Sequence, residues 1–200
     1  MNKNSLARSW AIRLPILALA LAGLTACTDT VGMSAGTMGG SKVSVSSMQA
    51  PPRTLTLALA ERRDFAVSTA KAMRARGQRV WCVPFARNAS GIDIRGDARE
   101  WWGKANGIYD RGNEPQVGAV MAFSATRKNP RGHVAVVSQV LSDREILIDH
   151  ANWTRNKVSL GMKVIDISDK GDWSRVRVES TPGTLGRPYP VTGFIYPVEG

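Results

Sequence analysis

The chain has 200 residues, of which 43% are hydrophobic and 22% are charged, and its formal net charge is +11 at pH 7. This length is enough for one domain with a sizeable hydrophobic core. The excess of Lys and Arg suits a negatively charged partner, such as a lipid surface, an anionic polymer or a nucleic acid. Only two cysteines occur, Cys27 and Cys82, which excludes a disulfide-rich scaffold.

Residues 1–26 are interpreted as a signal peptide that is not part of the fold. Basic residues precede an apolar run at 14–24. This run is shorter than the ~20 apolar residues that a membrane-spanning helix needs, so a retained helix is disfavoured. The run ends in Leu24-Thr25-Ala26-Cys27, which resembles the bacterial lipobox, whose cysteine receives lipid and becomes the mature N-terminus. An ordinary signal peptide followed by an incidental cysteine is the alternative.

Export and lipidation restrict the expected compartment and partners. Lipid on Cys27 anchors the protein to a membrane, and the following Thr28 favours the outer membrane facing the periplasm. Export argues against nucleic acid as a partner, so the expected partners are the membrane and the peptidoglycan of the cell wall, and we expect a monomer. Cys82 is then a single thiol in an oxidising compartment, where a leftover cysteine indicates intermolecular pairing or a reactive role.

The segment after the lipid site is expected to join the anchor to a folded domain. Residues 27–56 are rich in Ser, Gly, Met and Thr and are predicted to form a flexible tether. A helix is predicted at 57–77, with Phe65, Val67, Ala70 and Met73 as its apolar side and Gly77 as its end. Whether this helix packs on the domain is left open.

Residues 78–200 are predicted to form the domain, with helices first and strands afterwards. Cys82 lies at or just before the first turn of a helix at 83–89, and Asp97 is a candidate N-cap of a second one. Strands separated by turn residues are predicted at 117–123, 132–141, 145–153, 162–167, 174–178 and 193–196. This order predicts an α+β domain with an antiparallel sheet of about five or six strands.

The two histidines of the chain, His133 and His150, stand on strands that are predicted to form a hairpin. Strand alternation places His150 and Asn152 on the same face of the sheet. A cysteine nucleophile needs a lowered pKa, which a helix N-terminus and a neighbouring imidazolium both provide. Cys82 and His133 are therefore a candidate nucleophile and base, and His150 or Asn152 could orient the imidazole.

Five segments stand in an order that is specific as a set. They are 81–87 (WCVPFAR), 101–102 (WW), 117–120 (VGAV), 132–137 (GHVAVV) and 149–153 (DHANW). In this order the chain resembles CHAP domains, which are cysteine- and histidine-dependent amidohydrolases and peptidases related to NlpC/P60 and papain-like enzymes. The resemblance covers roughly residues 78–198.

The resemblance implies a papain-like, NlpC/P60-like core in which N-terminal helices pack on the sheet. It also implies a hydrolase that cleaves an amide bond of peptidoglycan, as an N-acetylmuramoyl-L-alanine amidase or a peptide-stem endopeptidase. The family's cysteine and histidine fall on Cys82 and His133, its downstream Asn falls on Asn152, and its third residue, often Glu, falls on His150. A neutral imidazole cannot hold an imidazolium as a carboxylate does, so the identity of the orienting group stays open.

Two other functions are compatible with the same residues. The domain could be a catalytically weak or inactive module that binds the cell wall or a protein partner. It could also be an amidase or transferase that acts on a small thiol or polyamine conjugate. Structural interpretations exist as well, since Cys82 and His133 could be core residues and His150 a hydrogen-bonded structural partner.

The remaining candidates concern the walls of a substrate groove. Four tryptophans are expected in the core or in a groove wall: Trp81, Trp101, Trp102 and Trp153. Basic residues at Arg127, Lys128, Arg131 and Arg155 are expected to be solvated surface. No metal site and no cofactor are predicted, because the Cys and His residues lack the close spacing of zinc motifs.

Overall fold

The computed structural model describes residues 53–198. The predicted signal peptide, the lipid-accepting Cys27 and most of the predicted tether lie outside the described residues. Within the described part, no helix combines the length and the apolar character that a membrane crossing requires.

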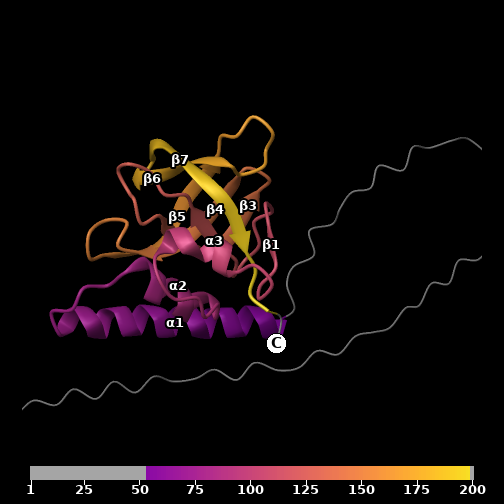
Figure 1. Ribbon diagram of the computed structural model, residues 1–200. Helices are drawn as coiled ribbons and strands as arrows, with labels where there is room; N and C mark the ends of the chain where they lie inside the picture. The colour runs from indigo at the N-terminus through magenta and orange to yellow at the C-terminus, as the bar shows by residue number, and fades with distance from the viewer. Residues whose placement is uncertain (1–52, 199–200) are drawn as a thin grey trace, which may run out of the picture. The chain divides into compact units, whose positions relative to one another are not determined.

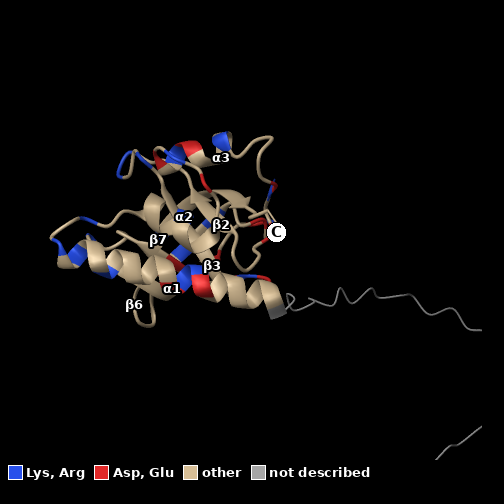
Figure 2. Ribbon diagram, turned by 90° about the horizontal axis from the view of Figure 1, so that it is seen from below, with Lys and Arg blue, Asp and Glu red and all other residues tan. Residues whose placement is uncertain are grey.

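Helix α1 (Arg53–Ala75) runs along one side of the domain next to α2 (Cys82–Ser90), as Figures 1 and 2 show. It begins at Arg53, earlier than the predicted residue 57. Ala66 and Ala70 are buried in the core that α1 shares with α2, whereas Phe65 is 59% exposed. The helix therefore docks through small residues, which allow the close approach of the two helices, and Phe65 lies away from this contact.

Two short helical turns follow α2, and the rest of the domain is a sheet. The turns are η1 (Ala98–Glu100) and α3 (Trp101–Lys104). The strands are β1 (Arg111–Gly112), β2 (Val120–Phe123), β3 (His133–Ser142), β4 (Glu145–Ala151), β5 (Val158–Asp166), β6 (Arg175–Thr181) and β7 (Thr184–Ile195). All pairings are antiparallel, in the order β1-β7-β2-β3-β4-β5-β6. Because β7 also pairs with β6, six of these strands close into a barrel (Figure 1).

The predicted papain-like α+β fold is wrong, since the domain is a closed antiparallel barrel with few helices. The error lies in β7, of which only residues 193–196 are predicted as a strand. Residues 184–190 of β7 contain Gly186, Pro188 and Pro190, and Gly and Pro are disfavoured inside strands. In the structure Pro190 nevertheless lies opposite Arg175 of β6, and this pairing closes the barrel.

Alternating residues of β2 and β3 supply two separate cores. Met121 and Phe123 of β2 face the barrel interior together with Phe194 of β7. Val134 and Val136 of β3 face outwards and pack in the core of the helices. Both faces of these strand segments are therefore buried, which explains why their sequences are apolar at nearly every position.

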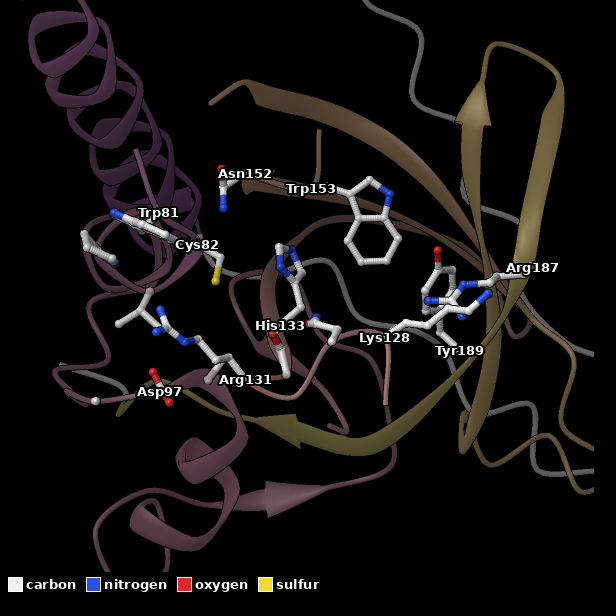
Figure 3. Close-up of a pocket in the computed structure, with 16 residues that line it drawn as sticks. Trp81, Cys82, Asp97, Lys128, Arg131, His133, Asn152, Trp153, Arg187 and Tyr189 are labelled. Carbon is white, nitrogen blue, oxygen red and sulfur yellow. Dashed lines mark hydrogen bonds between the residues drawn. The ribbon is translucent and has the colours of Figure 1, made fainter. Parts of the chain in front are cut away.

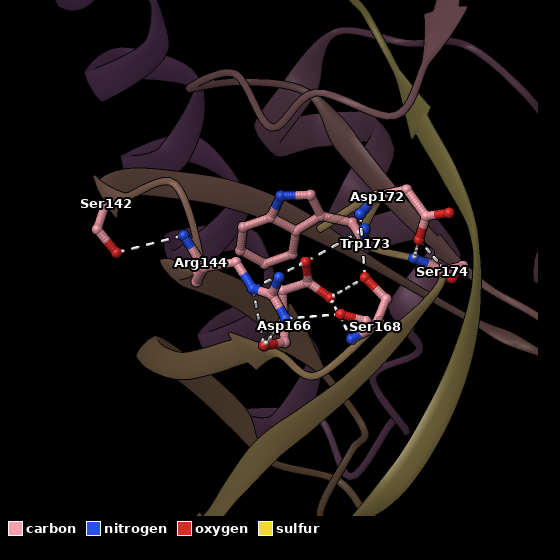
Figure 4. Close-up of polar contacts among 7 residues, drawn as sticks. All are labelled: Ser142, Arg144, Asp166, Ser168, Asp172, Trp173 and Ser174. Atoms are coloured by element: carbon pink, nitrogen blue, oxygen red, sulfur yellow. Dashed lines mark hydrogen bonds and ion pairs between the residues drawn. The ribbon is translucent and has the colours of Figure 1, made fainter. Parts of the chain in front are cut away.

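A buried carboxylate fixes the loop between β5 and β6 (Figure 4). Asp166 Oδ1 accepts hydrogen bonds from the backbone N–H of Ser168 at 2.8 Å and from its hydroxyl at 2.7 Å. Oδ2 accepts one from the N–H of Trp173 at 3.4 Å and lies 3.3 Å from Nε of Arg144. Both oxygens are thus satisfied by groups of the loop and its neighbour, as expected for a structural role.

Candidate functional site

A pocket of about 580 Å³ opens at the end of the barrel where β3 begins and β4 ends. Cys82, His133, Asn152 and Trp153 are among its lining residues. In Figure 3 the Cys82 thiol and the His133 ring face one another. Three separate elements therefore converge here: the first turn of α2, the start of β3 and the end of β4.

Cys82 is the first residue of α2, and no side chain caps this helix end. Three backbone N–H groups act on the sulfur and lower the pKa of the thiol: those of Val83 and Cys82 belong to this helix end, whereas that of Val134 comes from β3. Burial has the larger effect, however, and raises the pKa of Cys82 above its ordinary value. The sequence prediction of a lowered thiol pKa identifies a real contribution but omits this larger one.

His133 is placed at the start of β3 by the preceding Gly132. The φ of Gly132 is +68°, and a Cβ at this position would lie 2.9 Å from the backbone nitrogen of Arg99 and 3.0 Å from the carbonyl oxygen of Phe123. Only glycine fits this close approach, because other residues rarely adopt such a φ and would also clash. His133 is consequently held opposite Phe123 of β2, with its side chain buried.

The two histidines form a direct hydrogen bond, with 3.0 Å between Nε2 of His133 and Nδ1 of His150. His150 is fully buried, and its Nε2 has no hydrogen-bond partner among the described residues. Burial lowers the pKa of His150 to about 3. Burial and the neighbouring His150 hold the pKa of His133 well below its ordinary value. Both imidazoles are therefore neutral at pH 7.

Asn152 lines the same pocket but does not contact His133 through its oxygen. Its Oδ1 accepts a hydrogen bond from the backbone N–H of Asn156 at 2.9 Å. The same oxygen also accepts a hydrogen bond from Nε of Arg79 at 3.4 Å. The φ of Asn152 is +63°, so this residue leaves the strand after Ala151. Strand alternation therefore does not determine its direction, and His150 is the residue that the structure brings to His133.

The four tryptophans have different environments. Trp153 lies within the pocket, 5.0 Å from the His133 ring centre and 5.4 Å from that of His150. Trp81 lines the pocket, is 40% exposed, and carries the guanidinium of Arg79 at 3.9 Å from its ring centre. Trp101 is fully buried in the helical core and Trp102 packs against that core, so the structure does not bring these two to the pocket.

Several pocket residues are missed by the sequence analysis. Arg187 and Tyr189 belong to the proline-containing half of β7, which no local pattern identifies as a strand. Lys128 and Arg131 are exposed, as expected, but they also line the pocket. Among residues 53–198, no cluster of three or more His, Cys, Asp or Glu side chains is arranged to hold a metal ion.

Residues 73–152 match the family model of the CHAP domain. The match begins near the end of α1 and ends at Asn152, and it contains Cys82, His133 and His150. No curated protein matches the chain. CHAP domains are typically hydrolases, and the match indicates a function of the peptidoglycan hydrolase kind.

Proposed function

We propose that this domain hydrolyses an amide bond of peptidoglycan with Cys82 as the nucleophile and His133 as the base. The bond is either the muramoyl–alanine amide or a bond within the peptide stem. The observation that carries the proposal is the arrangement of the Cys82 thiol at the start of α2, facing a histidine ring whose far nitrogen is bonded to His150. A nucleophile, a base and an orienting group in this order are the parts that a cysteine hydrolase requires.

The roles of the ring nitrogens follow from the hydrogen bond between the histidines. Nε2 of His133 is engaged with His150, which leaves Nδ1 to accept the proton of the thiol. For Nδ1 to be a base, Nε2 of His133 must carry the hydrogen and donate it to Nδ1 of His150. The proton of His150 then resides on its Nε2, the atom that has no partner among the described residues.

The thiol and the imidazole are both neutral before the reaction, because burial disfavours the charged form of each. Proton transfer from Sγ to Nδ1 of His133 therefore accompanies attack of the sulfur on the amide carbonyl. The N–H of Cys82 at the helix start, which acts on the sulfur before the reaction, becomes available to the developing oxyanion once the sulfur bonds to the carbonyl carbon. His133 returns the proton to the leaving amine, and a water molecule, activated by the same ring, hydrolyses the thioester.

Digestion of purified sacculi tests this function. The described domain is incubated with sacculi, new amino groups are counted, and the products are identified by mass spectrometry of the muropeptides. We expect cleavage by the wild type and a loss on the order of 10⁴-fold or more in Cys82→Ala, with an unchanged melting temperature. Cleavage by Cys82→Ala at the wild-type rate would remove the nucleophile assignment, and the muropeptide masses identify the bond that is cut.

The second candidate is a binding module that has lost catalysis. It is favoured by the raised pKa of Cys82 and by a neutral His150 where a carboxylate is common in similar domains. This function predicts that the wild type sediments with sacculi but releases no amino groups over long incubation. Equal sedimentation of wild type and Cys82→Ala, without product from either, would decide for the module.

We also propose export and lipidation at Cys27, on the N-terminal motif alone, since these residues lie outside the described part. Full-length protein expressed in bacteria is expected to fractionate with the outer membrane. Cys27→Ala should shift it to the soluble periplasmic fraction and remove the added acyl mass. N-terminal peptides whose masses differ only by the replacement of Cys by Ala would contradict lipidation.

A further inference from the structure

The pocket continues away from Cys82 along a row of aromatic rings. The ring centre of Trp153 lies 5.0 Å from that of His133, and the ring centre of Tyr189 lies 4.8 Å from that of Trp153. The guanidinium carbon of Arg187 lies 4.7 Å from the Tyr189 ring centre. The path from His133 along these rings to Arg187 is therefore no longer than about four residues of an extended peptide, so one short substrate peptide can reach both ends.

Two cations stand at the far end of this row. Lys128 comes from the loop between β2 and β3, and Arg187 comes from β7. Figure 3 shows both at the Tyr189 end of the pocket, away from Cys82. Neither forms an ion pair with any carboxylate of the described residues. By contrast, Lys104 and Lys163 on the surface are paired with Glu100 and Glu145.

The carboxylate that lines the pocket lies away from these two cations (Figure 3). Asp97 is the carboxylate that lines it within the described part, and Figure 3 shows Asp97 at the Cys82 end. Asp97 is also near Arg99, at 3.8 Å. Two like charges at one end of a cavity repel each other, and a bound anion removes that repulsion while gaining charge-assisted hydrogen bonds.

We propose that Lys128 and Arg187, with the aromatic wall of Trp153 and Tyr189, form a subsite for a free carboxylate of the substrate peptide. This inference rests on the proposed function for the identity of the substrate, and it specifies an acidic peptide stem that extends past the aromatic row. The guanidinium of Arg187 suits a carboxylate because it presents two parallel N–H donors, and stacking on Tyr189 holds it in place.

The test compares muropeptides that have free carboxylates with the same muropeptides amidated by carbodiimide and ammonia. Binding is measured by calorimetry on Cys82→Ala, so that no turnover is needed, and kcat/KM is measured on the wild type. We expect the free carboxylate form to be preferred about tenfold, as two exposed charged contacts allow. The preference should decrease as salt concentration rises.

The variants Lys128→Gln and Arg187→Gln assign this preference to the subsite. The double variant, in the Cys82→Ala background, should bind the free carboxylate and the amidated muropeptides equally. Both affinities should match the affinity of Cys82→Ala alone for the amidated muropeptides. Arg127→Gln is the matched control, because it removes one exposed positive charge from the neighbouring position, and Arg127 does not line the pocket. It should retain the preference.

The outcomes separate this inference from the proposed function. Absence of cleavage by the wild type, combined with selective binding of the carboxylate form, would refute the hydrolase and support the subsite. Equal or undetectable binding of the two forms overturns the subsite, whether or not the wild type cleaves them. A preference that survives in the double variant overturns it as well.

Discussion

Two buried polar clusters in this domain differ in how completely their atoms are satisfied. Around Asp166, each carboxylate oxygen has partners in the same loop or on Arg144. His133, which lines the pocket, shares one hydrogen bond with the buried His150, and Nε2 of His150 has no partner among the described residues. A saturated cluster can only hold the chain together, whereas an unsaturated one retains the capacity to bind and to transfer protons.

The largest expected difference between the Asp166 cluster and the histidine pair is the loss of amide cleavage when the base, His133, is replaced. His133→Gln removes the proton acceptor of Cys82, so amide cleavage should fall on the order of 10³- to 10⁴-fold. Initial rates on sacculi, with the melting temperature as a folding control, measure this change. A variant that keeps more than a tenth of the wild-type rate would show that another group takes the proton.

The Asp166 cluster should respond in stability and not in rate. Asp166→Ala leaves Arg144 and two N–H groups without their buried acceptor, and we expect about 3 kcal/mol lower free energy of unfolding. Urea unfolding measures this loss, and the rate per folded molecule should be unchanged. Asp172→Ala is the matched control, since Asp172 belongs to the same loop but bonds Ser174 at an exposed position. A similar loss in both variants would contradict the structural role of Asp166.

The orienting residue should have an intermediate effect on catalysis. His150→Ala removes the acceptor of His133 Nε2, and we expect kcat to fall about 10²-fold while KM stays near its wild-type value. His150→Gln keeps an oxygen that can accept from Nε2, so it should recover part of kcat. Equal kcat for the two variants would mean that His150 acts by filling space.

The last expected effect concerns the pH dependence of stability. Both histidines have a pKa below their ordinary value in the folded domain, so the unfolded chain binds more protons below pH 6.5. Their contribution is complete above pH 6.5 and decreases as pH falls below it, and for His150 the loss continues to about pH 3, its pKa in the folded domain. The difference in unfolding free energy between wild type and the His133→Gln/His150→Gln double variant isolates this slope from the carboxylates. A difference that is constant from pH 7 to pH 4 would contradict buried, neutral histidines.

Local sequence patterns predict much of the secondary structure here but not the closure of the sheet. Residues 132–141 and 145–153 are predicted strands that correspond to β3 and β4, since apolar residues and turn residues mark their limits. The pairing that closes the barrel depends on Pro188 and Pro190, which lie opposite β6 although proline disfavours strands. Only the tertiary context reveals this half of β7, and the wrong fold class follows from its omission.

In the candidate site, too, some residues are predictable from local sequence patterns and others are not. His133 and His150 are predictable neighbours because a hairpin joins their strands, and their rings are hydrogen-bonded. The direction of Asn152 is not predictable from alternation, because its positive φ ends the strand. Arg187 and Tyr189 reach the pocket only through the part of β7 that the sequence patterns miss.

The reactivity of Cys82 as a function of pH tests most directly whether the pocket cluster is a chemical unit. Alkylation by iodoacetamide is followed by mass spectrometry from pH 5 to pH 10, in the wild type and in His133→Gln. We predict that the wild type reacts about tenfold faster or more between pH 6 and pH 8, because neutral His133 accepts the thiol proton. Both proteins should converge above the raised pKa of Cys82, where the thiolate forms without help. Identical profiles for the two proteins would show that the sulfur and the imidazole do not act together.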